Sequence, residues 1–242
     1  MIDLVQQRAE IIARLHAAER IAGRLEGSTQ LLAVSKKHPA SSIRVLAMAG
    51  QRCFGENYIQ EAQVKLSLLS DLDLEWHLIG PLQSKKTRLA ATLFHWVHSV
   101  DRWKIAQRLS DQRPTELPPL NICLEVNVNG EMTKSGVRPA DLLDLSRAVA
   151  TLPNIRLRGL MTIPAPLTED TDATAARIPF RILRELFESL RAQGLELDTL
   201  SMGMSDDLEA AVAEGATIVR IGTAIFGTRS DTGETCTAHP EN

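Results

Sequence analysis

The feature that most restricts the fold of this chain is a regular alternation of short apolar segments with longer segments of helical period. Eight segments have the length and residue types of buried strands, and between them apolar residues recur three and four positions apart. This alternation is typical of βα units that form a parallel sheet. Eight units predict closure of the sheet into a single (β/α)8 TIM barrel of the α/β class. The predicted strands cover residues 31–35, 52–55, 75–80, 96–100, 120–128, 156–163, 197–202 and 217–221.

An additional helix is predicted before the first strand, with Asp3 available as its cap, and we expect it to pack on the outside of the barrel. We expect one domain over residues 1–229 and a disordered polar tail over residues 230–242. The apolar residues of the additional helix are Leu4, Ile11, Leu15, Ala18, Ala22 and Leu25. The helices predicted between the strands cover residues 41–50, 56–69, 84–93, 102–112, 139–152, 173–193 and 205–214.

Composition excludes several classes of partner. The net charge is only −3 and the basic residues are dispersed, so no nucleic-acid interface is predicted. The first 25 residues lack the apolar core of a signal peptide, and no apolar run is long enough to span a membrane, which favours a cytoplasmic protein. The three cysteines, Cys53, Cys123 and Cys236, lack metal-like spacing. We predict no metal site and interpret His77 and His98 as hydrogen-bonded barrel residues.

Lys36 stands directly behind the first predicted strand, at the end where active sites of barrels gather. The side-chain period of two places Lys36 on the same strand face as Leu32 and Val34, and Arg220 on the same face as Gly222 in the eighth strand. Closure of the barrel makes these two strands neighbours. If both faces point inward, Lys36 and Arg220 meet.

The fifth strand indicates a polar barrel interior, because its apolar face leaves Cys123, Glu125 and Asn127 to point inward. Arg220 lies within an apolar segment, so its charge needs a partner there. Glu125 is one possible partner, and a ligand atom is the other.

The loops after the seventh and eighth predicted strands are suited to phosphate. Gly203 and Gly222 allow backbone N–H groups to approach an anion, and Ser205 and Thr223 carry hydroxyl groups. The helix predicted to begin near Ser205 adds unpaired N–H groups. Either loop alone could consist of ordinary turn glycines and cap residues, but two such loops in the expected positions favour a phosphate site.

Many separate segments, in order over residues 28–229, resemble the pyridoxal phosphate homeostasis proteins. The resemblance implies one (β/α)8 barrel, similar to the barrel domain of alanine racemase and to the start of ornithine decarboxylase. Lys85, where the family usually has Asn, and Leu78, where Phe is common, depart from the pattern. The matching segments are Leu32-Ala33-Val34-Ser35-Lys36, Phe54-Gly55-Glu56-Asn57-Tyr58, His77 with Ile79-Gly80-Pro81-Leu82-Gln83-Ser84, Ser99-Val100-Asp101-Arg102, Lys134-Ser135-Gly136, Arg158-Gly159-Leu160-Met161, Ser201-Met202-Gly203-Met204-Ser205 and Val219-Arg220-Ile221-Gly222-Thr223-Ala224-Ile225-Phe226-Gly227.

The resemblance also implies a cofactor, pyridoxal 5′-phosphate, and the residues that bind it. It assigns Lys36 the covalent aldimine, a Schiff base, and assigns Arg220 the contact with the pyridine nitrogen. The resemblance assigns no catalytic residue. It places phosphate contacts at Ser205, Gly222 and Thr223, with Ser201, Met204 and Asn57 nearby.

The predicted surroundings of Lys36 favour a carrier over an enzyme. Arg220 can only donate a hydrogen bond, so it leaves the pyridine nitrogen unprotonated and weakens the electron sink that carbanion chemistry needs. The single tyrosine, Tyr58, is interpreted as a packing residue. We therefore expect a cytoplasmic, monomeric protein that holds the cofactor without turnover and releases it, with PLP-dependent apoenzymes as possible recipients. An amino-acid racemase or decarboxylase is the alternative, and a Schiff-base aldolase is a third.

Overall fold

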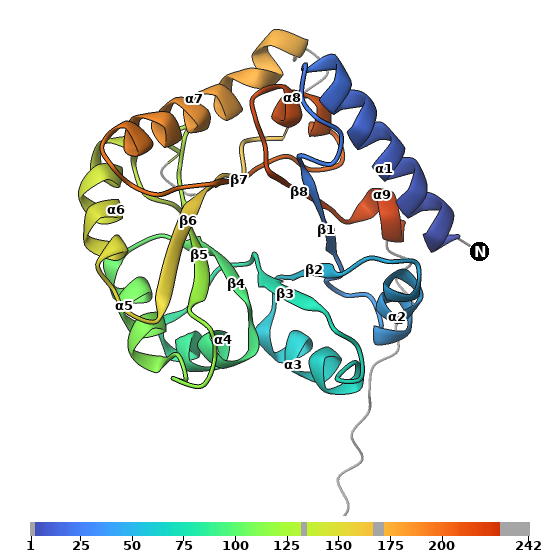
Figure 1. Ribbon diagram of the computed structural model, residues 1–242, viewed down its shortest axis with the longest axis horizontal. Helices are drawn as coiled ribbons and strands as arrows, with labels where there is room; N and C mark the ends of the chain where they lie inside the picture. The colour runs from blue at the N-terminus through green and yellow to red at the C-terminus, as the bar shows by residue number, and fades with distance from the viewer. Residues whose placement is uncertain (1–2, 132–134, 167–171, 228–242) are drawn as a thin grey trace, which may run out of the picture.

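The computed structural model describes residues 3–131, 135–166 and 172–227 and shows eight parallel strands closed into a barrel in sequence order. Figure 1 shows the strands as a central ring with helices around it. The predicted (β/α)8 barrel is therefore confirmed, while the predicted tail lies outside the described residues. The strands are β1 (Gln30–Val34), β2 (Cys53–Glu56), β3 (Glu75–Leu78), β4 (Trp96–Val100), β5 (Leu120–Glu125), β6 (Ile155–Met161), β7 (Thr199–Ser201) and β8 (Ile218–Ile221).

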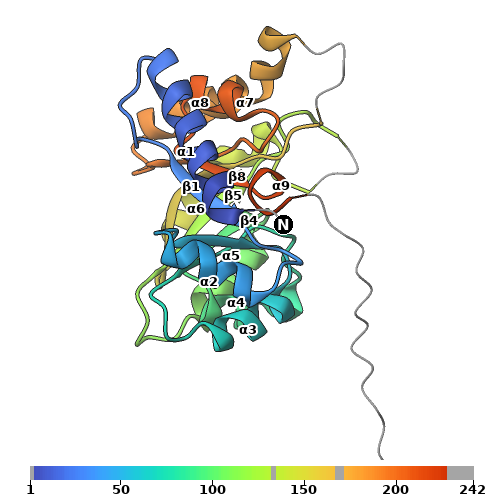
Figure 2. The same cartoon turned by 90° about the vertical axis from the view of Figure 1, so that its right-hand side faces the viewer.

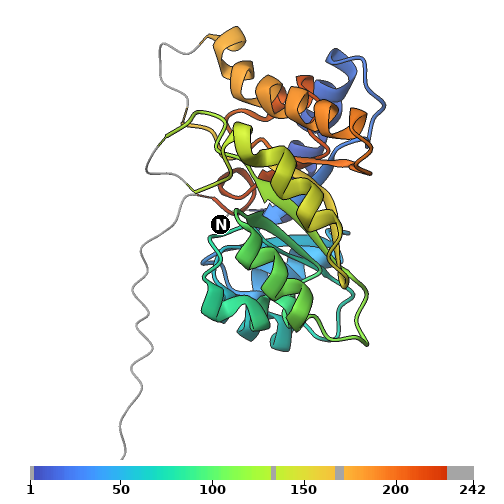
Figure 3. The ribbon, with the colours of Figure 1, turned by 90° about the vertical axis from the view of Figure 1, so that its left-hand side faces the viewer.

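The helices form an outer layer, which the side views of Figures 2 and 3 show from opposite directions. None of the described helices is long and apolar enough to cross a membrane. The α-helices are α1 (Leu4–Ile21), α2 (Ala40–Met48), α3 (Ile59–Leu68), α4 (Thr87–Leu93), α5 (Trp103–Gln112), α6 (Leu142–Ala150), α7 (Ala173–Ala192), α8 (Leu208–Ala213) and α9 (Thr223–Phe226), and short 3-10 helices, η1 (Ser84–Lys86) and η2 (Pro139–Asp141), precede α4 and α6.

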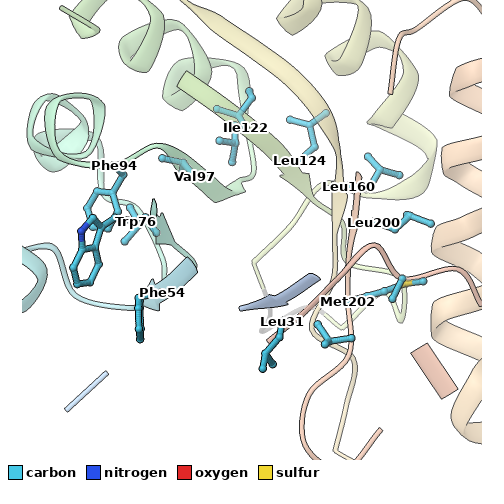
Figure 4. Packing of buried hydrophobic residues seen from close by; sticks show 14 of the residues in the cluster. Leu31, Phe54, Trp76, Phe94, Val97, Ile122, Leu124, Leu160, Leu200 and Met202 are labelled. Atoms are coloured by element: carbon cyan, nitrogen blue, oxygen red, sulfur yellow. The ribbon is translucent and has the colours of Figure 1, made fainter. Parts of the chain in front are cut away.

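Most of the apolar core lies between the strands and the helices, and Figure 4 shows part of this layer. Ile122, Leu124 and Val126 belong to it, as the predicted outward face of the fifth strand requires. Inside the barrel the buried apolar side chains form two small clusters, one with Leu32, Val34, Cys53, Ile79 and Ile218 and the other with Trp96, Cys123 and Met161. The inward phases predicted for Leu32, Val34 and Cys123 are thus confirmed, and much of the remaining interior is polar.

The additional N-terminal helix, α1, forms as predicted and packs outside the barrel against α8, α9 and α2. Asp3 caps it by accepting hydrogen bonds from the backbone N–H groups of Val5 and Gln6, at 3.0 and 3.1 Å. Leu25, predicted to lie on the apolar face of this helix, is 84% exposed. That prediction is wrong because the helix ends at Ile21, four residues earlier.

Candidate functional site

The predicted site residues lie on four strands that are adjacent in the barrel. β1 pairs with β2 on one side and β8 on the other, and β8 pairs with β7. Leu32 of β1 is in register with Arg220 of β8. Lys36 follows β1, Asn57 follows β2, and the segments after β7 and β8 hold the predicted phosphate residues, so all of these positions lie at the carboxyl ends of neighbouring strands.

The turn that carries Lys36 is fixed from outside the barrel. The buried Ser35 hydroxyl donates to Glu56 Oε1 at 2.6 Å, and Lys65 Nζ donates to the carbonyl oxygen of Ser35 at 2.7 Å. Lys37 then adopts the left-handed region, with φ of 64°. Lys36, which lies between Ser35 and Lys37 in this turn, is half-buried.

Arg220 is only 4% exposed and is held by two hydrogen bonds inside the barrel. Nη1 donates to Ser201 Oγ and Nη2 donates to the carbonyl oxygen of Thr162, each at 2.9 Å. Burial lowers the pKa of Arg220 to about 10, and the carboxylates of Asp207 and Glu125 partly oppose this shift. Glu125, named from the sequence as one possible partner, therefore acts on Arg220 by charge, while the bonded partners are Ser201 and Thr162.

Glu125 points into the barrel end near Arg220 and lines a cavity of about 190 Å³. Burial, and to a smaller extent the nearby carboxylate of Asp101, raise the pKa of Glu125 to about 7 against the opposing charge of Arg220. A carboxyl group in these surroundings changes its charge near neutral pH.

The loop after β7 has the close packing that requires glycine. Gly203 has φ of 94°, and a Cβ there would lie 2.5 Å from Ala211 Cβ. The helix expected to begin near Ser205 is present but begins later, at Leu208. The reason is that Asp207 accepts a hydrogen bond from the backbone N–H of Met204, which closes a turn around Ser205 before the helix starts.

The loop after β8 passes close to β1. A Cβ at Gly222 would lie 3.3 Å from the carbonyl oxygen of Val34. Thr223 is exposed and begins the short helix α9, whose first N–H groups have no acceptor within the helix. These two residues leave backbone and hydroxyl donors beside the end of β1.

Asn57 contributes a polar atom that calls for a ligand. Its Oδ1 is buried without a hydrogen-bond partner among the described residues. Its backbone packs tightly, because a Cβ at Gly80 would lie 2.4 Å from the carbonyl oxygen of Asn57. A buried acceptor oxygen of this kind is stabilised when a hydrogen-bond donor reaches it.

His77 and His98 are fully buried and hydrogen-bonded, which confirms how they were interpreted from the sequence. His77 Nδ1 lies 2.9 Å from His98 Nε2, and His98 Nδ1 lies 2.7 Å from Ser201 Oγ. The hydrogen bond between the two histidines and the one to Ser201 were not predicted from the sequence. The available signal was their inward phase on neighbouring strands.

One group of metal-ligand type occurs within the described part of the chain, at the amino end of the barrel. One ligand atom from each of Cys53, Glu75 and His77 lies within 4.8 Å of the others. The sequence spacing did not predict this group. Glu75 Oε1 and His77 Nε2 already bond to each other at 2.8 Å.

Several known proteins are similar to this chain over most of its length. A family model described as "Alanine racemase, N-terminal domain" matches residues 12–230. The "Pyridoxal phosphate homeostasis protein" of Pseudomonas aeruginosa is 58% identical over 229 residues, which cover 95% of this chain and 97% of the relative. The protein of the same name from Escherichia coli K12 is 49% identical over 235 residues, which cover 95% of this chain and 98% of that protein.

Solved structures are similar as well. PipY of Synechococcus elongatus, solved with PLP bound, has a TM-score of 0.77 and 44% identity, and the match covers 89% of this chain and 100% of PipY. The alanine racemase of Corynebacterium glutamicum has a TM-score of 0.67 at 20% identity, and the match covers 99% of this chain and 65% of the racemase. The second similarity concerns the fold alone.

Proposed function

Since the chain belongs to the family of pyridoxal phosphate homeostasis proteins, we propose that it binds pyridoxal 5′-phosphate at the carboxyl end of its barrel and holds it for release to other proteins. The observation that carries this proposal is the arrangement of β1 and β8. Lys36 follows β1, and the neighbouring β8 contributes the buried guanidinium of Arg220.

In this proposal each site residue has a distinct task. The amine of Lys36 would hold the cofactor covalently at its aldehyde carbon, with the aldehyde oxygen released as water, and Arg220 would donate to its pyridine nitrogen. Asn57 Oδ1, which is buried without a hydrogen-bond partner among the described residues, is assigned the role of an acceptor for the cofactor. The phosphate contacts are assigned to Ser205, Gly222 and Thr223, with Ser201 and Met204 completing the wall.

We assign a holding role, not turnover, on the basis of Arg220. When bound, the cofactor can supply an electron sink, but a permanent donor at its ring nitrogen keeps that nitrogen unprotonated and the sink weak. Tyr58, the single tyrosine of the sequence, is 51% exposed at the start of α3. This exposure favours a surface role for Tyr58 over proton transfer to a bound substrate.

The proposal extends to a cytoplasmic monomer that delivers the cofactor to PLP-dependent apoenzymes. The proposed site residues all come from four adjacent strands of one barrel and from the loops after them, which supports a monomer. Light scattering of the purified protein would test the oligomeric state.

The carrier role is tested by loading the protein with pyridoxal phosphate and mixing it with a PLP-dependent apoenzyme. We expect the apoenzyme to regain activity while the loaded protein, incubated with amino acids in deuterated water, exchanges no α-hydrogen at enzymatic rates. Rapid α-hydrogen exchange would indicate a racemase or decarboxylase instead. Failure to transfer cofactor to any apoenzyme would contradict the carrier role.

A further inference from the structure

Five polar side chains form a continuous line of hydrogen bonds through the barrel interior, from Glu75 at the amino end to Arg220 near the carboxyl end. We call Glu75, His77, His98, Ser201 and Arg220 the interior network. Its successive contacts measure 2.8, 2.9, 2.7 and 2.9 Å. The network therefore links the proposed cofactor site to the opposite end of the barrel.

The ends of the interior network fix the position of every proton between them. The hydrogen bond from His77 lowers the pKa of Glu75 to about 2, so Glu75 is an anion that can only accept. Burial lowers the pKa values of His77 and His98, so both are neutral, and each carries one ring proton.

The proton order then follows by elimination. His77 Nε2–H donates to Glu75, which leaves His77 Nδ1 as an acceptor for His98 Nε2–H. His98 Nδ1 must accept in turn, so the Ser201 hydroxyl donates to it. Ser201 Oγ is left with lone pairs for Arg220, which can only donate. All the donors point from Arg220 toward Glu75.

Burial makes this order rigid. His77, His98 and Ser201 are completely buried and Arg220 is 4% exposed, so water cannot replace a broken link without a large desolvation cost. The terminal charges are opposite in sign, which polarises the neutral groups between them in the same direction. The orientation of the Ser201 hydroxyl is thereby set from a distance by Glu75.

From this geometry we infer that Glu75, His77 and His98 are positioning residues that hold Ser201 and Arg220 in the orientation that meets the ring nitrogen of the cofactor. The inference rests on the proposed function, because it assigns the ring nitrogen to Arg220. Its distinctive element is the link between the two histidines, which touches no cofactor atom in the proposal. Removing this hydrogen bond by a substitution at His77 or by one at His98 should disturb the orientation of Arg220 to the same extent.

Two substitutions break the link from opposite sides. In the His98→Asn variant, the side-chain amide occupies the position of the imidazole Nδ1 and can still form a hydrogen bond with Ser201. The side chain is too short to reach His77. In the His77→Gln variant, the side-chain amide occupies the position of the imidazole Nε2 and can still form a hydrogen bond with Glu75. It cannot form the hydrogen bond with His98. We expect each variant to weaken binding of pyridoxal phosphate by ~10-fold, as loss of one buried hydrogen bond would.

The double variant is the decisive member of this series, because both substitutions remove the same link. We expect its affinity to match that of either single variant, whereas independent structural damage would multiply the two losses. Multiplied losses would overturn the inference, as would single variants that bind like the parent protein. His95→Gln is the matched control, because His95 Nδ1 accepts from the backbone N–H of Trp76 and lies outside the interior network.

The proton order can be measured without any cofactor. Long-range nitrogen–proton NMR spectra of the cofactor-free protein should show His77 and His98 protonated at Nε2 alone and unchanged from about pH 8 to about pH 6. This result stands or falls independently of whether Lys36 binds the cofactor. A proton at His77 Nδ1 alone would overturn the inference, because Nε2 would then have no proton to donate to Glu75 and the order of donors would not run toward Glu75.

Discussion

Arg220 is the residue on which the proposed site depends most, because its charge is buried and oriented by Ser201 and by the carbonyl oxygen of Thr162. We expect Arg220→Ala to weaken retention of pyridoxal phosphate by roughly 10- to 100-fold, since a charged donor is lost from a buried site. Equilibrium titration monitored by absorbance would measure this. Arg220→Met, which preserves volume, controls for the cavity, and affinity unchanged in both variants would show that Arg220 serves the fold alone.

The buried carboxyl group of Glu125 should lower the free energy of unfolding at neutral and alkaline pH. Its folded-state pKa of about 7 lies above the value for an unfolded chain, so its destabilising effect is absent at acidic pH and grows as the pH rises to about 7. We expect Glu125→Gln to raise the free energy of unfolding at pH 8 by about 3 kcal/mol and to have little effect at pH 4.5. Urea denaturation at both pH values would check this, with the exposed Glu116→Gln as control. An equal effect at both pH values would contradict the assignment.

At the residue scale, side-chain phase could be predicted from sequence but bonding partners could not. The period of two correctly placed Leu32 and Val34 inside the barrel. It could not show that Arg220 donates to the backbone carbonyl oxygen of Thr162. Every residue has a carbonyl oxygen, so the sequence cannot indicate which of them accepts a side-chain hydrogen bond.

Among the elements, β6 and β7 show how tightly the strands pack. A Cβ at Gly159 of β6 would lie 1.7 Å from the carbonyl oxygen of Thr199, a backbone atom that cannot move aside. We expect Gly159→Ala to lower the free energy of unfolding by at least about 3 kcal/mol. Chemical denaturation would measure the loss. Gly55→Ala of β2 is a matched control, because its Cβ would meet only side-chain atoms of Ile79 and Leu32 at 3.3 Å, and a loss as large there would contradict the explanation.

The element boundaries that were predicted wrongly have local causes. The fifth strand was expected to continue to Val128 because apolar residues alternate that far, but β5 ends at Glu125. Beyond it, Asn127 N–H donates to the carbonyl oxygen of Val137, so the backbone takes a new pairing partner from a later segment. Apolar alternation reports burial and cannot identify which segment supplies the hydrogen bonds.

For the molecule as a whole, the buried histidines predict a loss of stability in mild acid. The pKa values of His77 and His98 are lower in the folded protein than in the unfolded chain. The unfolded chain therefore takes up protons first as the pH falls below about 6.5, and each histidine should cost about 1.4 kcal/mol per pH unit. Urea unfolding at a series of pH values should show this slope, and His98→Asn should reduce it. A slope unchanged by that substitution would mean that His98 is already protonated in the fold.

The closed barrel could be predicted because the number of βα units, eight, does not depend on the exact boundary of any one strand or helix. The central claim is that this barrel holds pyridoxal phosphate through Lys36. The most direct test is borohydride reduction of the loaded protein followed by mass spectrometry of its peptides. We predict that the reduced cofactor is fixed on the peptide containing Lys36 and that Lys36→Ala abolishes this modification. Cofactor fixed on another lysine, or none fixed at all, would contradict the account.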